Sequence, residues 1–217
     1  MSLERIRELL TQLPGHSLVH GGSHAGKLYQ NYPWPPLDVL PAHRHDTQAR
    51  LDWLLGKLGN VKDRYVLDCG CANGAIAIGL RLKGALINGI TPDAVESGIA
   101  NYADKCMGAE FSNFFAVDAT YILDKPRNIV LCLSVWKWIV RNQGMEAANG
   151  MLRKLNAKVL IFESGLTDGG LDLGIGITKA DIPDILRKHT GCEPELLGIE
   201  PREDGTEREV WRCRRNV

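Results

Sequence analysis

The sequence has no excess of charge of either sign: among its 217 residues, 26 lysine and arginine side chains balance 26 aspartate and glutamate side chains. Proteins that bind long nucleic acids tightly usually carry a basic excess, which displaces counterions from the phosphates. The balance therefore disfavours a long RNA or DNA partner, although a neutral total is compatible with a local basic patch. We expect a small-molecule partner rather than a nucleic acid.

The sequence also lacks long apolar runs and paired metal-binding motifs. No stretch approaches the roughly 20 apolar residues that cross a bilayer, and the N-terminus has no apolar core of the signal-peptide kind. The six cysteines are scattered, and Cys69 and Cys71 have no second Cys or His pair at zinc-site spacing. These absences predict a cytoplasmic protein with reduced cysteines, no membrane association and no bound metal.

Glycine and proline are concentrated near the N-terminus. Residues 3–13 place leucine and isoleucine at helical spacing, which predicts a short amphipathic helix. From residue 14 to residue 44, glycines and prolines alternate with Tyr29, Tyr32 and Trp34. Such a composition is typical of a loop or arm that packs through aromatic side chains rather than of a regular element.

A regular pattern resumes at Asp46, which can cap a helix that ends at Gly59. We therefore divide the chain into two units. Residues 1–45 form an N-terminal helix and an aromatic, Gly/Pro-rich arm that could act as a lid, and residues 46–217 form the main domain.

In the main domain, strand and helix patterns alternate, and Pro92 suits the first position of a helix. We expect strands at residues 65–69, 85–90, 111–117, 128–133, 158–162, 195–199 and 208–213. We expect helices between them at residues 75–82, 92–105, 144–155 and 179–188. Alternating elements with nearly continuously apolar strands predict a three-layer α/β fold, in which helices cover both faces of a mainly parallel sheet.

A glycine-rich segment follows the first strand of the main domain and leads directly into a helix. In an open parallel sheet, ligands bind beyond the carboxyl ends of the strands, where glycines let a ligand approach the backbone. A dinucleotide-binding loop would have glycine in place of Asp68 and two residues, rather than three, between Gly70 and Gly74. A carboxylate here would repel a pyrophosphate but attract an amino-acid ammonium group. The residues therefore favour S-adenosylmethionine (SAM) over NAD.

This segment resembles motif I of the class I SAM-dependent methyltransferases, and later segments resemble further motifs of that family in order. The resemblance runs from about Arg50 to the C-terminus. It implies a Rossmann-like, seven-stranded sheet with an antiparallel C-terminal hairpin strand, SAM as cofactor and S-adenosylhomocysteine (SAH) as product. The residues it assigns to the cofactor are Asp68, Gly70, Cys71, Ala72, Asn73, Gly74, Asp118, Ala119, Leu133 and Ser134.

One position departs from the pattern of that family. Its second strand normally ends in an acid that binds the ribose hydroxyls, whereas Thr91 stands there in this sequence. A threonine hydroxyl bonds a ribose hydroxyl less strongly, because charge-assisted hydrogen bonds are about twice as strong as neutral ones. Asp93 could also reach the ribose, so we expect Thr91, Asp93 or both at this part of the cofactor.

The run from Cys132 to Ile139 resembles the corresponding segment of the methylphosphate-capping RNA methyltransferases. Tyr29, Tyr32 and Arg44 resemble residues upstream of that group's SAM site, which implies that they close over the cofactor. Val140 stands where that group has a histidine. The resemblance therefore indicates kinship without the same substrate.

Methyl transfer depends mainly on positioning and on exclusion of water, and it needs a general base only when the acceptor must be deprotonated. The acceptor-side candidates after the fourth and fifth strands are Trp136, Lys137 and Glu163. Two of them have plainer alternatives, since Trp136 could simply pack in the core and Lys137 could be a solvated loop lysine.

Three functions remain open from the sequence. The first is a SAM-dependent methyltransferase that acts on a small or medium-sized acceptor. The second is an RNA methyltransferase that acts on a base or a terminal phosphate, which requires a basic mouth between Ser134 and Arg141. The third is a non-catalytic module that binds SAM or a partner, which the missing ribose acid favours slightly.

Overall fold

The computed structural model describes residues 3–13, 26–110, 113–121, 126–166, 176–203 and 205–215. Its seven-stranded sheet contains β3 (Tyr65–Cys69), β4 (Leu86–Thr91), β5 (Phe114–Ala116), β6 (Arg127–Leu133), β7 (Ala157–Glu163), β8 (Pro194–Glu200) and β9 (Arg208–Arg214). The α-helices are α1 (Leu3–Leu10), α2 (Thr47–Leu58), α3 (Ala75–Leu82), α4 (Ala94–Cys106), α5 (Trp136–Gln143), α6 (Met145–Lys154) and α7 (Ile182–Thr190). Single 3-10 turns occupy Leu37–Val39, Ala119–Tyr121 and Lys179–Asp181.

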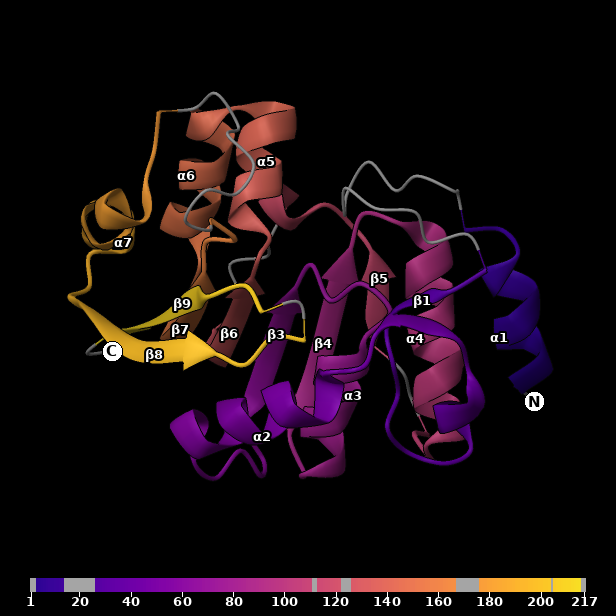
Figure 1. Ribbon diagram of the computed structural model, residues 1–217. Coiled ribbons are helices and arrows are strands. Elements are labelled where there is room, and N and C mark those ends of the chain that lie inside the picture. Colours follow the sequence, from indigo (N-terminus) through magenta and orange to yellow (C-terminus); the bar gives the residue numbers. More distant parts are fainter. Residues whose placement is uncertain are drawn as a thin grey trace.

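The strands are ordered β5-β4-β3-β6-β7-β9-β8 across the sheet (Figure 1). Strands β5, β4, β3, β6 and β7 run parallel, and β9 runs antiparallel to both of its neighbours, β7 and β8. The predicted fold class is confirmed: the protein has a Rossmann-like, mainly parallel sheet with an antiparallel C-terminal hairpin strand.

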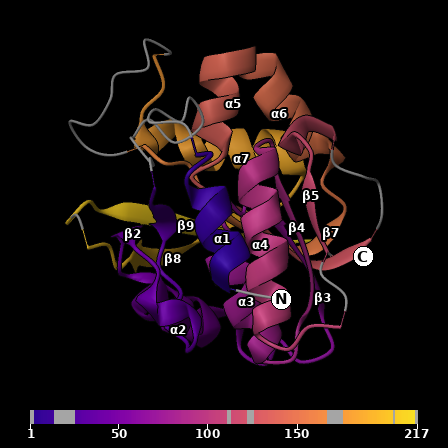
Figure 2. The ribbon, with the colours of Figure 1, turned by 90° about the vertical axis from the view of Figure 1, so that its right-hand side faces the viewer.

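Alternate residues of the inner strands point to opposite faces of the sheet, and each face has its own apolar core. In β3, Val66 packs with the core formed by α1 to α4, whereas Leu67 packs with the core formed by α5 to α7. Ile129 and Val130 divide between the two cores in the same way. Figure 2 shows α5, α6 and α7 grouped on one side of the sheet and α1 to α4 on the other. Burial on both faces explains why the strands are nearly continuously apolar.

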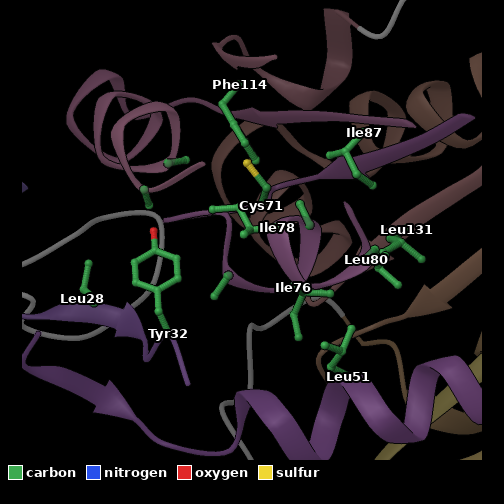
Figure 3. Close-up of a cluster of buried hydrophobic side chains, with 14 of the residues drawn as sticks. Leu28, Tyr32, Leu51, Cys71, Ile76, Ile78, Leu80, Ile87, Phe114 and Leu131 are labelled. Carbon is green, nitrogen blue, oxygen red and sulfur yellow. The ribbon is translucent and has the colours of Figure 1, made fainter. Parts of the chain in front are cut away.

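The described part of the N-terminal arm is more regular than the sequence predicts. Two short strands, β1 (Leu28–Gln30) and β2 (Ala42–Arg44), pair in parallel outside the main sheet. Leu28 and Tyr32 are fully buried in the same core as Leu51 of α2 and Ile76 of α3 (Figure 3). The prediction of an arm without regular elements is therefore wrong for these residues, because three-residue strands are too short to show periodicity. Residues 14–25 lie outside the described ranges.

Other local expectations also change. Residues 136–143, where no helix is predicted from the sequence, form α5, because Trp136, Ile139 and Val140 share one buried helical face. Helix α4 begins at Ala94, two residues after Pro92. The predicted strand at 111–117 is described from residue 113 and is paired over Phe114–Ala116.

Asp46 precedes α2 as expected, but its side chain makes no cap hydrogen bond. Its carboxylate instead accepts hydrogen bonds from the Arg44 guanidinium and from the backbone N–H of Glu203, at 3.1 Å in the second case. A guanidinium two residues away and a backbone N–H from a distant segment thus take the place of the local cap. Within the described ranges, none of the helices is both long and apolar enough to cross a membrane.

The packing of α3 against α2 and the arm gives a test with a matched control. A Cβ on Gly79 in α3 would lie 2.5 Å from Leu51 and 2.8 Å from Trp34, whereas a Cβ on Gly56 in α2 meets no atom within 4 Å. Alanine is favoured over glycine in a helix by about 1 kcal/mol, but overpacking costs about 1–3 kcal/mol. We expect Gly56→Ala to raise the free energy of unfolding and Gly79→Ala to lower it in urea denaturation. A stabilised Gly79→Ala variant would contradict this packing.

Candidate functional site

A cavity of about 330 Å³ opens at the carboxyl ends of β3, β4 and β6, and we call it the principal cavity because nine of the predicted site residues line it. The strand order reverses here, because β4 lies on one side of β3 and β6 on the other. Ligands of open α/β sheets bind at such a reversal. The predicted site residues that line this cavity are Tyr29, Arg44, Gly70, Thr91, Asp118, Ala119, Leu133, Ser134 and Lys137.

Two glycines of the loop after β3 have left-handed backbone conformations, with φ values of +72° at Gly70 and +77° at Gly74. A Cβ on Gly70 would overlap Val135, whose side chain also lines the cavity. A Cβ on Gly74 would come within 2.9 Å of both Ala100 and Phe114. Gly70 therefore belongs to the cavity wall, whereas Gly74 lets α4 and β5 pack against the loop.

Asp68, Cys71 and Ala72 border a smaller cavity that shares Gly70 and Ser134 with the principal one. The side chain of Cys71 is buried in the apolar core and points toward Phe114 (Figure 3).

The carboxylate of Asp68 is buried, with 4% of the residue exposed. Burial raises the pKa of Asp68 to about 7, and the positive charge of Arg50 offsets only part of this effect. A cation that entered the neighbouring cavity would be attracted to this carboxylate and would lower its pKa. Asp68 is thus suited to bind a positively charged group.

Thr91 and Asp93, the two residues expected near the ribose, have different surroundings at the end of β4. Thr91 borders the principal cavity, and its hydroxyl donates a hydrogen bond of 3.1 Å to the buried carboxylate of Glu96 in α4. Asp93 does not line this cavity. Its carboxylate caps α4 by accepting hydrogen bonds from the backbone N–H groups of Val95 and Glu96, at 2.7 and 3.0 Å. Of the two candidates, Thr91 is therefore the one at the cavity.

Asp118 is fixed at the cavity wall through both carboxylate oxygens. One oxygen accepts hydrogen bonds of 2.7 Å from the backbone N–H and from the hydroxyl of Thr120. The other accepts a hydrogen bond of 2.7 Å from the side-chain amide of Gln143, at the end of α5. Gln143 also lines the cavity, next to Asp118 and Ala119.

Glu163 lies at the end of β7, but it is fully buried and does not line either cavity. Its carboxylate forms ion pairs with Arg202 at 2.6 Å and Arg208 at 3.2 Å, and it accepts a hydrogen bond from the Ser134 hydroxyl. Burial opposes ionisation, but the two arginines and Ser134 outweigh it, so the pKa of Glu163 lies below its ordinary value. A carboxylate that is held in this way is not available as a general base.

Ser134 forms the turn between β6 and α5. Its φ of 63° lies in the left-handed region, where few non-glycine residues are found. The backbone N–H of Ser134 donates a hydrogen bond of 2.9 Å to the carbonyl oxygen of Glu163, which adds to the side-chain bond. These two bonds hold the turn, and the turn places Val135 against Gly70.

Positive charge gathers where α5 and β9 meet the cavity. The Lys137 ammonium and the Arg208 guanidinium both donate to the carbonyl oxygen of Gly165, at 2.8 and 3.0 Å. Lys137 and Arg141 each lie 5.4 Å from the centre of the Trp138 ring. Trp138 also lines the cavity, so basic and aromatic side chains lie together at this part of its opening, which we call the mouth.

Trp136, another acceptor-side candidate, is fully buried and lies in the core beneath α5. Its ring packs edge-on against Phe162 with a centroid distance of 6.3 Å, and its indole N–H donates to Asn149 at 3.4 Å. The structure thus places Trp136 away from the cavity, in agreement with the packing alternative.

The arm contributes two of its three predicted residues to the cavity. The Arg44 guanidinium lies 5.9 Å from the centre of the Tyr29 ring, and both residues line the cavity. Tyr32 has no exposed surface, and its hydroxyl donates a hydrogen bond to the backbone carbonyl oxygen of Asn73, which is 1% exposed. Tyr32 and Asn73 therefore lie behind the loop rather than at the cavity.

Five residues at or next to the site could not be found from the sequence, because no motif marks them: Arg50, Glu96, Gln143, Arg202 and Arg208. The only signal for Arg208 was its position at the start of the last strand, which the fold inserts beside β7. No group of three or more His, Cys, Asp or Glu side chains within the described ranges is arranged to hold a metal ion.

No family model and no curated protein matches this sequence. Among solved structures, the bifunctional kinase-methyltransferase WbdD is similar with a TM-score of 0.71 and 21% identity, over 96% of this chain and 46% of WbdD. Magnesium protoporphyrin IX methyltransferase from Synechocystis PCC 6803 with bound SAM is similar with a TM-score of 0.62 and 23% identity, over 78% of each chain. A putative RNA methyltransferase from Pyrococcus horikoshii has a TM-score of 0.56 and 17% identity, over 99% of this chain and its own full length.

The chain has the fold of the class I SAM-dependent methyltransferases. It spans about half the length of WbdD. The Synechocystis enzyme has also been crystallised with SAH. At these identities the likeness concerns the fold.

The raised pKa of Asp68 predicts a pH-dependent stability cost. Because the folded protein holds this proton more tightly than the unfolded chain, the unfavourable contribution grows as the pH rises from the ordinary pKa toward about 7. Asp68→Asn removes the charge, so we expect it to stabilise the protein more at about pH 8 than at about pH 5, by roughly 2–3 kcal/mol. Urea denaturation of both proteins at both pH values measures the difference. An equal effect at the two values would show that Asp68 is not perturbed.

Proposed function

We propose that this protein is a SAM-dependent methyltransferase that acts on a small or medium-sized acceptor. The observation that carries the proposal is the buried Asp68 carboxylate beside the open backbone of Gly70, at the reversal of strand order. The similar fold of an enzyme crystallised with SAM and with SAH supports the same cofactor. All six cysteines are free, which supports the proposal of a reducing, cytoplasmic compartment.

The residues at the two cavities fit the chemical groups of SAM. Asp68 would hold the ammonium group of its amino-acid end, and Arg44 offers a positive charge for the carboxylate of the same end. Thr91 and Asp118 line the principal cavity, where Thr91 would bind the ribose and Asp118 would accept a hydrogen bond from the adenine amino group. When bound, SAM supplies a methyl group activated by a sulfonium.

The residues around the cavity support an acceptor that reacts without losing a proton to the protein. Among the described residues that line the principal cavity, Asp118 is the one carboxylate and there is no histidine. Asp118 is assigned to the adenine of the cofactor, and Glu163 is buried between arginines. The protein would therefore act by positioning the acceptor and excluding water.

The charges at the cavity support an anionic group on this acceptor. Besides Arg44, which is assigned to the cofactor, Lys137 and Arg208 line the cavity, and Glu163 and Gly165 hold Arg208 in place. Arginine binds carboxylate and phosphate groups well, because its planar donors match their oxygens.

One observation favours a second candidate function, methylation of RNA. Lys137 and Arg141 both lie close to the Trp138 ring, and Arg141 is exposed. An aromatic ring with basic neighbours can stack a nucleic-acid base and hold its phosphates. The balanced total charge of the chain therefore coexists with a local basic patch at the mouth.

Binding of SAH should depend on the ionisation of Asp68. Because the ionised carboxylate attracts the ammonium group, we expect affinity on the order of micromolar above neutral pH. The affinity should fall about tenfold between about pH 8 and about pH 6. Calorimetry measures the affinity, and Asp68→Asn should bind weakly without this pH dependence. Absence of SAH binding by the folded wild-type protein would disprove the proposed cofactor.

The acceptor can be sought by measuring SAH release with pools of carboxylates, phosphates and short RNAs. We expect Arg208→Gln to lower kcat/KM for the reactive acceptor at least about tenfold, with little change in SAH affinity. Arg212→Gln is the matched control, because Arg212 lies on the same strand but pairs with Glu195 at 2.7 Å outside the cavity. Both variants should retain the fold by circular dichroism.

Arg141→Gln separates the two candidate functions in the same assay. A loss of activity with RNA alone, which grows with added salt, would favour the RNA methyltransferase. A protein that binds SAH but turns over no acceptor in any pool would instead fit the non-catalytic module.

A further inference from the structure

The side chain of Asn73, in the glycine loop, pairs with the arm as a neighbouring strand would. Its amide oxygen accepts a hydrogen bond of 3.1 Å from the backbone N–H of Gln30, and its amide nitrogen donates one of 2.9 Å to the backbone carbonyl oxygen of Gln30. The Tyr32 hydroxyl adds a third bond, to the backbone carbonyl oxygen of Asn73. We call these three bonds the Asn73 clasp. All three residues are at most 5% exposed.

The clasp sets the position of the cavity wall that the arm provides. In β1, Leu28 and Gln30 are buried and Tyr29 between them is half-buried, so the Tyr29 side chain points to the other face of the strand. Gln30 pairs in register with Arg44 of β2. Tyr29 and Arg44 both line the principal cavity beside Gly70. A strand that is held by Asn73 therefore brings an aromatic ring and a guanidinium to the loop that carries Asp68.

We propose that Asn73 is a positioning residue, which clasps β1 to the cofactor loop so that Tyr29 and Arg44 complete the subsite for the amino-acid end of SAM. The inference rests on the proposed function. It replaces the expectation that Asn73 touches the cofactor itself, because its amide is engaged by Gln30 and it is 1% exposed. It also replaces a swinging lid with a fixed wall, as far as the described part of the arm is concerned.

A simple structural role for Asn73 would affect every part of the cofactor site equally. The clasp instead predicts a selective effect, since Asp118 and Thr91, which are placed for the nucleoside, lie on other elements and have their own hydrogen-bond partners. The amino-acid end can be removed from the ligand without altering the nucleoside, because 5′-methylthioadenosine is the thioether nucleoside of SAH without that end. Comparison of the two ligands separates positioning from general damage.

The test is a calorimetric comparison of SAH and 5′-methylthioadenosine with the wild-type chain and with Asn73→Asp. Aspartate has nearly the same shape, but it cannot donate to the Gln30 carbonyl oxygen and places a negative charge against it. We expect SAH affinity to fall at least about tenfold, with 5′-methylthioadenosine affinity within about twofold of the wild-type value. Hydrogen exchange should become faster at the backbone N–H of Gln30. Asn60→Asp, at an exposed turn, is the control that should change neither affinity.

Tyr32→Phe provides a second test that does not depend on the folding of Asn73→Asp. It removes one bond of the clasp and keeps the ring in the core, so the same selective loss is expected on a smaller scale. An equal loss for both ligands in either folded variant would overturn the proposal, and so would unchanged affinity for both. If the wild-type chain binds 5′-methylthioadenosine but not SAH, the assignment of the amino-acid subsite is wrong. If it binds neither ligand, the proposed function itself is contradicted.

Discussion

The reversal of strand order between β3 and β6 is the constraint from which the site follows. The chain that leaves β3 enters α3 on one face of the sheet, and the chain that leaves β6 enters α5 on the opposite face. The two connections must diverge, and the space between them is the cavity. Gly70 and Val135 are in contact where these connections begin, which explains why no side chain fits at position 70.

Buried charge gives this cavity its chemistry. Glu200 and Glu163 are linked through Arg202, at 2.5 and 2.6 Å, and Arg50 pairs with Glu200 at 3.0 Å. Buried ions are tolerated only when they are paired, so this network fixes its members in place. The ion pair with Glu163 holds Arg208 at the cavity. For Asp68, in contrast, the charge of Arg50 offsets only part of the effect of burial, so its pKa stays raised. A destabilised carboxylate of this kind is a common feature of binding sites, because the ligand supplies the missing charge.

The arm is joined to the glycine loop by hydrogen bonds to its backbone, and two of its residues form part of the cavity wall. The core beneath Tyr32 fixes one end of β1, and Asn73 satisfies the two backbone groups of Gln30 that face the loop. The ion pair of Arg44 with Asp46 and the bond from Glu203 to Asp46 connect β2 to the turn before β9. The wall beside Gly70 is therefore built from three segments that are far apart in the sequence.

The sequence by itself determined the sheet and the glycine loop, because both depend on local patterns. The nearly continuous apolar run at residues 65–69 predicted a strand that is buried on both faces, and the spacing from Asp68 to Gly74 identified the turn. Local patterns could not predict strands of only three residues, or contacts between residues that are far apart in the sequence. Glu163 was a catalytic candidate because it ends a strand. Its carboxylate is instead paired with Arg202 and Arg208, which lie 39 and 45 residues later in the sequence. Asn73 looked like a ligand contact, and its amide meets a backbone 43 residues earlier. Only the tertiary structure decided these roles, since a polar side chain bonds to whichever partner the fold brings within reach.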